Sequence, residues 1–247
     1  MKTIAIMNQK GGVGKTTTAL NLAADLTKRD NKILIIDFDP QGNLTQTLNH
    51  SGGEYNALEF LQGNLDKGYN TLQGLFIAST PGLTKAEAIF DGTGKEHKLA
   101  EALQPLQKEF DYCIIDTPPA LGLLTTQALT AADYVIIPTQ PDLYGINGIY
   151  QLMQTITAVK KYCNPKLKLA GILITRYKNT VAKKSAAEEL EKVAKRIGTR
   201  AFKTRIRECN ALFEAQIMKK DIYRHAPKSN AAADYRAFTD ELLQAIQ

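Results

Sequence analysis

Short apolar runs alternate with helix-length segments along almost the whole chain of 247 residues. Ile, Val and Leu fill consecutive positions in these runs, so a strand formed there would be apolar on both faces. Such strands are buried on both sides, as in a parallel sheet that is covered by helices. The runs predict strands at residues 3–7, 33–36, 75–78, 112–115, 134–137 and 169–174.

The segments between these runs have the length and spacing of helices. We expect helices over residues 15–29, 96–108, 123–131, 146–162, 182–197 and 231–247. Strands that alternate with helices through right-handed crossovers form a doubly wound α/β fold, with a mostly parallel sheet and helices on both faces. Because no stretch has the composition of a linker, the prediction is a single domain over residues 1–247.

Composition excludes several other classes of protein. Hydrophobic residues make up 44% of the chain and charged residues 23%, which is typical of a globular protein and unlike a disordered one. The three cysteines form no C-x-x-C pair, so the sequence predicts neither a disulfide framework nor a zinc site. Because no run has the length of a signal-peptide core or of a membrane span, we expect a cytoplasmic protein.

A glycine-rich segment lies between the first expected strand and the first expected helix. It reads Gln9-Lys10-Gly11-Gly12-Val13-Gly14-Lys15-Thr16-Thr17. Its glycines allow successive N–H groups to turn inward, and the helix N-terminus adds partial positive charge, so the loop is expected to bind phosphates. Lys15 would reach the β- and γ-phosphates of a nucleotide, the Thr16 hydroxyl would bind Mg²⁺, and Thr17 would contact the α-phosphate.

Two acidic motifs follow later strands. Residues 36–43 read IDFDPQGN and residues 113–119 read CIIDTPP. Carboxylates at the carboxyl ends of parallel strands face the ligand crevice, where one of them can orient the water that attacks a γ-phosphate. Asp37 and Asp39 both stand where a carboxylate could take this role. Asp116, and Asp39 as well, would contact Mg²⁺ through water.

The loop departs from the usual G-x-x-x-x-G-K-[ST] pattern, because Gln9 replaces the first glycine and a second lysine, Lys10, precedes Gly-Gly. With this feature and both acidic motifs, nearly the whole chain resembles the ParA/MinD group of deviant Walker A ATPases. The resemblance implies hydrolysis of ATP to ADP with Mg²⁺, and an ATP-dependent homodimer in which Lys10 reaches the phosphates of the partner subunit. The resemblance also implies that Asp39 positions the attacking water, with Asp37 supporting the water and the Mg²⁺ shell. The predicted catalytic residues are Lys10, Lys15, Asp37 and Asp39.

The base of the nucleotide is expected at the carboxyl ends of the later strands. Arg176 ends one of these runs and is a candidate to stack on adenine, at a position that the resembled family often uses. An ordinary surface arginine is the alternative. Residues 138–142 and 206–208 end neighbouring strands, and Arg207 is a second candidate for the base pocket.

Within the resembled family, the C-terminal part separates the branches. Residues 226–232, APKSNAA, and the DPQGN run resemble the ParA branch, which partitions DNA. Residues 234–247 carry three acidic residues and one arginine, unlike the basic membrane helix of the MinD branch, so no membrane partner is expected. Cys113 precedes Asp116, whereas the nitrogenase iron protein requires its cluster cysteines after this motif.

Charge is distributed unevenly along the chain. Residues 1–150 hold 11 basic and 16 acidic residues, a balance of −5, and residues 151–247 hold 20 and 9, a balance of +11. A basic C-terminal part is compatible with nonspecific DNA binding, and a solvated basic face is the alternative. The candidate DNA contacts are Lys183, Lys184, Lys192, Lys195, Arg196, Arg200, Lys203, Arg205, Arg207, Lys219 and Lys220.

The resemblance further implies a ParB-like centromere-binding partner, partition of a plasmid or chromosome, and association with the nucleoid. Two alternatives remain open at this stage. One is a related ATPase that positions a protein cargo on the nucleoid. The other is a metabolic ATP-dependent enzyme on the same fold, such as a ligase of the dethiobiotin synthetase type.

Overall fold

The computed structural model describes residues 1–48, 56–64, 69–71 and 74–247, and its strands form one eight-stranded sheet with the order β3-β4-β2-β5-β1-β6-β7-β8. All neighbouring strands pair in parallel except β3 and β4, which are antiparallel. The expected mostly parallel sheet is therefore confirmed. The strands are β1 (Lys2–Ile6), β2 (Ile33–Asp37), β3 (Tyr69–Thr71), β4 (Gly74–Ile77), β5 (Tyr112–Asp116), β6 (Tyr134–Thr139), β7 (Lys168–Tyr177) and β8 (Ala201–Arg207).

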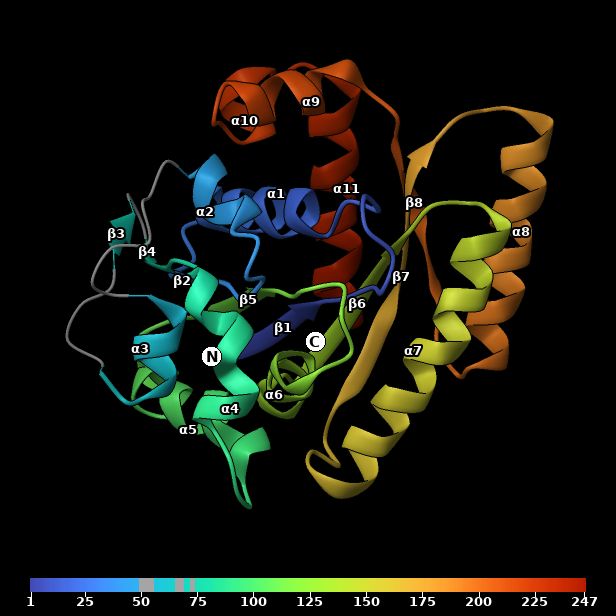
Figure 1. Ribbon diagram of the computed structural model, residues 1–247. Helices are drawn as coiled ribbons and strands as arrows, with labels where there is room; N and C mark the ends of the chain where they lie inside the picture. Colours follow the sequence, from blue (N-terminus) through green and yellow to red (C-terminus); the bar gives the residue numbers. More distant parts are fainter. Residues whose placement is uncertain (49–55, 65–68, 72–73) are drawn as a thin grey trace.

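Helices connect the strands and cover both faces of the sheet (Figure 1). The α-helices are α1 (Lys15–Lys28), α2 (Asn43–Thr47), α3 (Ala57–Leu61), α4 (Ala86–Ile89), α5 (Lys98–Leu103), α6 (Leu123–Ala131), α7 (Leu143–Tyr162), α8 (Val181–Arg196), α9 (Asn210–Ile217), α10 (Ile222–His225) and α11 (Asn230–Ala245). Short 3₁₀ turns are η1 (Pro81–Lys85), η2 (Lys95–His97) and η3 (Pro105–Lys108).

Two differences from the sequence prediction have local physical causes. The helix expected over residues 96–108 is divided into η2, α5 and η3, and the division before η3 falls at Pro105, which has no N–H to continue the helical hydrogen bonds. A strand is expected to end at residues 206–208, but no apolar run marks the body of β8, because this strand lies at the sheet edge and reads AFKTRIR, with basic residues between its buried ones.

Alternate side chains of each central strand enter different cores. Ile4 and Ile6 of β1 pack with α1 and α11 on one face, and Ala5 and Met7 pack with α7 and α8 on the other. The neighbouring strands β2 and β5 send their second set of side chains toward α3, α5 and α6. This two-sided burial explains why apolar residues fill consecutive positions in the central strands.

The last helix, α11, packs on the body of the protein, as its acidic composition predicts. Tyr235, Phe238 and Leu242 are fully buried against β8 and α1, and the Phe238 ring meets Phe202 edge-on at a centroid distance of 5.0 Å. Of the helices in the described part of the chain, none has the length and apolarity needed to cross a membrane.

The strand order places a crevice above β1. Strands β5, β2 and β4 lie on one side of β1, and β6, β7 and β8 lie on the other, so the loops after β1 and its neighbours diverge at this point. In open α/β sheets, ligands bind where the strand order reverses, at the carboxyl ends of the strands. The glycine-rich loop follows β1, and the two acidic motifs lie at the ends of β2 and β5, so all three lie at this edge of the sheet.

Candidate nucleotide site

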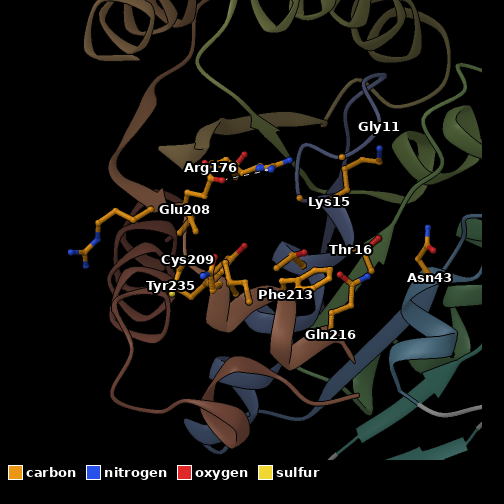
Figure 2. A pocket seen from close by; sticks show the side chains of 18 of the residues that line it. Gly11, Lys15, Thr16, Asn43, Arg176, Glu208, Cys209, Phe213, Gln216 and Tyr235 are labelled. Carbon is orange, nitrogen blue, oxygen red and sulfur yellow. Dashed lines mark ion pairs between the residues drawn. The ribbon is translucent and has the colours of Figure 1, made fainter. Parts of the chain in front are cut away.

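The glycine-rich loop joins β1 to α1 and borders a cavity of about 630 Å³ (Figure 2). Gly12 and Gly14 have φ angles of 72° and 90°, which residues with a Cβ rarely adopt. Gly14 is the N-cap of α1 and provides no side-chain cap, so the first N–H groups of the helix are left for a ligand. These features form the anion-binding concavity that the sequence predicts.

Side chains from distant strands hold this loop in place. The Thr175 hydroxyl, at the end of β7, donates to the Val13 carbonyl at 2.7 Å, and the Gln140 amide donates to the Gly12 carbonyl at 2.9 Å. Asn8 accepts a hydrogen bond from the Lys10 N–H at 3.0 Å. The two loop-to-strand contacts join residues 162 and 128 positions apart, so no local pattern in the sequence points to them.

Lys15 extends from the start of α1 into the buried base of the cavity. Its Nζ donates to the Lys10 carbonyl at 3.3 Å. Burial lowers the pKa of Lys15, while the carboxylates of Asp116 and Asp39 act in the opposite direction. The ammonium group therefore has negative neighbours but also capacity to bind a further anion, as a phosphate-binding lysine requires.

Asp116 ends β5 beneath the phosphate loop and is fully buried. Neither of its carboxylate oxygens accepts a hydrogen bond of normal geometry from the described residues. Burial and the nearby Asp37 raise its pKa well above the usual range, against the lowering effect of Thr16 and Lys15. A buried carboxylate with unpaired oxygens beside a threonine hydroxyl fits a hydrated Mg²⁺ ion, which prefers oxygen ligands and retains water.

Asp37 and Asp39 serve different parts of the loop after β2. Asp37 Oδ2 accepts from the N–H and the hydroxyl of Thr45, both at 2.7 Å, and its Oδ1 accepts from the Asp39 N–H at 3.3 Å. Burial raises the pKa of Asp37 to about 6 despite these bonds. Asp39 borders the cavity, with one oxygen accepting from the Gln41 N–H. Asp37 therefore orders the loop, and Asp39 faces the ligand space.

Replacing Thr45 by valine should destabilise this loop. The Thr45 hydroxyl donates to Asp37 and accepts from the Ser79 N–H at 2.8 Å. Valine keeps the backbone N–H bond to Asp37, so the isosteric change leaves the buried Ser79 N–H without its acceptor and Asp37 with one donor fewer. We expect a loss of about 1–3 kcal/mol in the free energy of unfolding, measured by urea titration. The control is T47V in the same helix, because within the described residues the Thr47 hydroxyl bonds only the carbonyl of Asn43 one turn back. An equal loss in both variants would contradict this explanation.

Lys10 lies at the mouth of the loop and forms an ion pair within its own chain. Its Nζ donates to Asp142 Oδ2 at 2.7 Å. Asp142 is also the N-cap of α7, where Oδ1 accepts from the Gly145 N–H at 2.8 Å. Burial acts to raise the pKa of Asp142, but the hydrogen bonds from Lys10 and the Gly145 N–H, together with the charges of Lys10 and Lys183, outweigh it, and the pKa lies below its usual value. The sequence analysis expected residues 138–142 beside the base pocket, whereas the structure places Asp142 against Lys10.

The far end of the cavity contains Arg176 and Glu208, which face each other in Figure 2. Arg176 has a φ of 49°, beside an irregularity in the pairing of β7 with β8, and its Nη2 lies 3.8 Å from Glu208 Oε1. Arg207 also borders the cavity, but its guanidinium donates to Asp234 of α11 at 2.6 Å. The structure thus brings Arg176 to the predicted base pocket and holds the Arg207 side chain against α11.

The candidate DNA contacts are spread over α8, β8 and the segment after α9. Several are already paired: Lys192 and Arg196 contact Glu189, and Arg205 contacts Glu191. Lys183 lies near the phosphate loop, because its Nζ donates to the Pro141 carbonyl at 3.2 Å, beside the Asp142 that holds Lys10. Arg207 borders the cavity itself.

Comparison with known proteins adds to this geometry. Residues 1–169 match a protein-family model described as an AAA domain. The chain is 39% identical over 253 residues to the chromosome partitioning protein ParA of Myxococcus xanthus, covering 98% of this chain and 87% of that protein. It is 36% identical over 250 residues to the chromosome-partitioning ATPase Soj of Thermus thermophilus, covering 100% and 97%. A solved structure of cobyrinic acid a,c-diamide synthase from Mycobacterium smegmatis, with an ATP analogue and magnesium, matches with a TM-score of 0.87 and 34% identity, covering 100% and 96%.

Proposed function

Because this chain belongs to the ParA-type partition ATPases, we propose that it dimerises with Mg²⁺ and ATP, binds DNA without sequence preference, and partitions a plasmid or chromosome with a ParB-like centromere-binding protein. The observation that carries the proposal is the phosphate loop, in which Lys15 points inward beside the unpaired carboxylate of Asp116 while Lys10 lies at the mouth. All helix layers pack on one sheet, which supports a single ATPase domain over residues 1–247.

Each residue of the site has a defined part in this proposal. Residues 11–14 and the first N–H groups of α1 would bind the phosphates, with Lys15 reaching the β- and γ-phosphates and Thr17 the α-phosphate. Thr16 directly, and Asp116 and Asp39 through water, would hold Mg²⁺, which neutralises charge between the β- and γ-phosphates. Asp39 would orient the attacking water and accept its proton.

Lys10 would act on the ATP of a second subunit, and Asp142 holds it back within its own chain. The D142N variant keeps an acceptor for the Gly145 N–H but removes the charge that attracts Lys10. Since the side chains of this pair are 33% and 27% exposed, its contribution is about 0.5–1 kcal/mol. Because each of the two subunits releases one such pair on dimerisation, we expect ATP-dependent dimerisation of D142N to be roughly fivefold to thirtyfold tighter by analytical ultracentrifugation. A weaker dimer, with unchanged thermal unfolding, would show that Asp142 supports the dimer instead.

The proposal is tested by DNA binding to a random-sequence duplex with ATP, with ADP and without nucleotide, across a salt series. We expect the protein to bind DNA with ATP but not with ADP or without nucleotide. The logarithm of the binding constant should fall with the logarithm of the salt concentration, with a slope of roughly −0.9 for each phosphate contact. Charge reversal at Lys183 and Lys184, beside the nucleotide edge, should reduce binding more than reversal at Lys160 and Lys161 near the end of α7. If the protein binds no DNA at low salt in any of the three nucleotide states, the proposed role in DNA partition is wrong. Binding with ATP would support nucleoid association.

A metabolic ATP-dependent enzyme is the second candidate, favoured by the similarity to the solved diamide synthase structure. Such an enzyme would couple ATP hydrolysis to its own small substrate and would be indifferent to DNA. Turnover measured with and without DNA, and with a carboxylic acid and an amide donor, separates the two functions. A cargo-positioning ATPase would share the DNA response, and a pull-down with ATP and a centromere-binding protein would separate it from partition.

A further inference from the structure

An exposed aromatic ring borders the cavity at the first turns of α9. The Phe213 side chain is 67% exposed, although it lies on a helix that packs on α1. We propose that Phe213 is the apolar platform for the nucleoside of the bound nucleotide, a part of the site that neither the sequence motifs nor the comparisons assign. This inference rests on the proposed binding of ATP.

Two fixed ends of the cavity place the nucleoside near Phe213. The phosphate loop and the start of α1 define one end, and Arg176 with Glu208 defines the other. Helix α9 lies between them, and Leu212 and Gln216 approach Thr16 and Thr17 of α1 in a small adjoining hollow. Figure 2 shows the Phe213 ring in the cavity, between Thr16 and Cys209. A nucleotide whose phosphates occupy the loop must pass α9 to reach Arg176.

The chemistry of the ring suits this position. Every base presents a flat π-face, and an aromatic ring can stack on it without a specific hydrogen bond. Stacking of one base on an aromatic side chain corresponds to roughly a tenfold to hundredfold change in affinity. Arg176 and Glu208 partly neutralise each other, so the remaining attraction for an uncharged base comes from apolar and aromatic surface.

Helix α9 also provides a matched control. Met218, which directly follows α9, is 55% exposed, but it does not border the cavity. If Phe213 contacted a second copy of the chain through general apolar surface, Met218 would be expected to do the same. If Phe213 contacts the nucleoside, replacing Met218 should have no effect on nucleotide binding.

Isothermal titration in the presence of Mg²⁺ tests the proposal with three probes: ADP, a non-hydrolysable ATP analogue and inorganic triphosphate. For F213A we expect about tenfold to hundredfold weaker binding of both nucleotides and unchanged binding of triphosphate. F213Y should bind like the wild type, because it retains the ring, and M218A should be unaffected. Thermal unfolding of F213A should match the wild type, since the side chain is exposed.

Three results would overturn the proposal. Equal weakening of nucleotide and triphosphate binding would assign Phe213 to the phosphate end or to the fold. Unchanged nucleotide binding with weaker ATP-dependent dimerisation would assign it to contact with a second copy. If F213A changed neither nucleotide binding nor ATP-dependent dimerisation, Phe213 would have no part in either process. In each of these cases the proposed ATPase function remains supported if the wild type binds nucleotide and K15A does not. A wild type that binds none of the probes would contradict both the ATPase function and the role of Phe213.

Discussion

K15A is expected to bind ATP at least a hundredfold more weakly than the wild type and to lose measurable hydrolysis. Lys15 is buried at the base of the cavity, where water screens its charge weakly, and it is the inward-facing cation of the phosphate loop. Removing one partner of a buried charge pair typically costs about 3–5 kcal/mol, which is roughly a hundredfold to several thousandfold in affinity. Titration calorimetry with Mg²⁺ and ATP measures the affinity, and phosphate release measures the turnover.

The control for K15A is K98A, because Lys98 is an exposed lysine on α5 that pairs only with Glu101, three residues away. K98A should bind ATP like the wild type. Folding must be checked in parallel, since K15A also removes a cation that lowers the pKa of the buried Asp116. K15A that remains folded and binds ATP with wild-type affinity would show that the phosphates do not bind in this loop.

D39A is expected to separate ATP binding from ATP hydrolysis. Asp39 borders the cavity, and its carboxylate has one backbone donor, the Gln41 N–H, which leaves further acceptor positions for a water. Loss of a positioned general base lowers turnover by roughly a hundredfold to ten-thousandfold, while ground-state binding of the phosphates through the loop should change by only a few fold. Single-turnover assays and titration with ATP measure the two quantities separately.

The D39N variant separates the effect of the negative charge of Asp39 from the effect of its hydrogen bond within the loop. The asparagine keeps an acceptor for the Gln41 N–H but removes the negative charge. We expect D39N to hydrolyse ATP as poorly as D39A, and both variants to remain on DNA when ATP is present. Near-normal hydrolysis by D39N would mean that Asp39 shapes the loop and that another group orients the water.

The central strands and the phosphate loop could be predicted because their signals are local. A strand that is buried on both faces is apolar at consecutive positions, as residues 33–36 of β2 are, and its ends are close to those predicted. Gly12 and Gly14 occupy positive-φ positions in the short connection from β1 to α1. Asp116 follows four buried or half-buried residues of β5. In each case, neighbouring residues carry the whole pattern.

The rest of the site depends on residues that meet only in the folded chain. The ion pair of Lys10 with Asp142 joins positions 132 apart, and the bonds of Arg207 to Asp234 join positions 27 apart. The sequence analysis proposed Arg176 first and Arg207 second for the base pocket, and it could not foresee that the Arg207 side chain is held by Asp234 of α11. Phe213 has no motif around it, and its relevance comes from the position of α9 beside the cavity.

Local patterns in the chain were enough to predict the parallel α/β sheet, the phosphate loop and the acidic residues at the strand ends, because hydrophobic periodicity and glycine conformation act over a few residues. Three further assignments came from the folded molecule: Asp37 orders a loop, Asp142 holds Lys10, and Arg176 borders the cavity. These assignments follow from contacts between distant segments, whose partners are chosen by packing and burial across the sheet, and such contacts leave no local trace in the sequence.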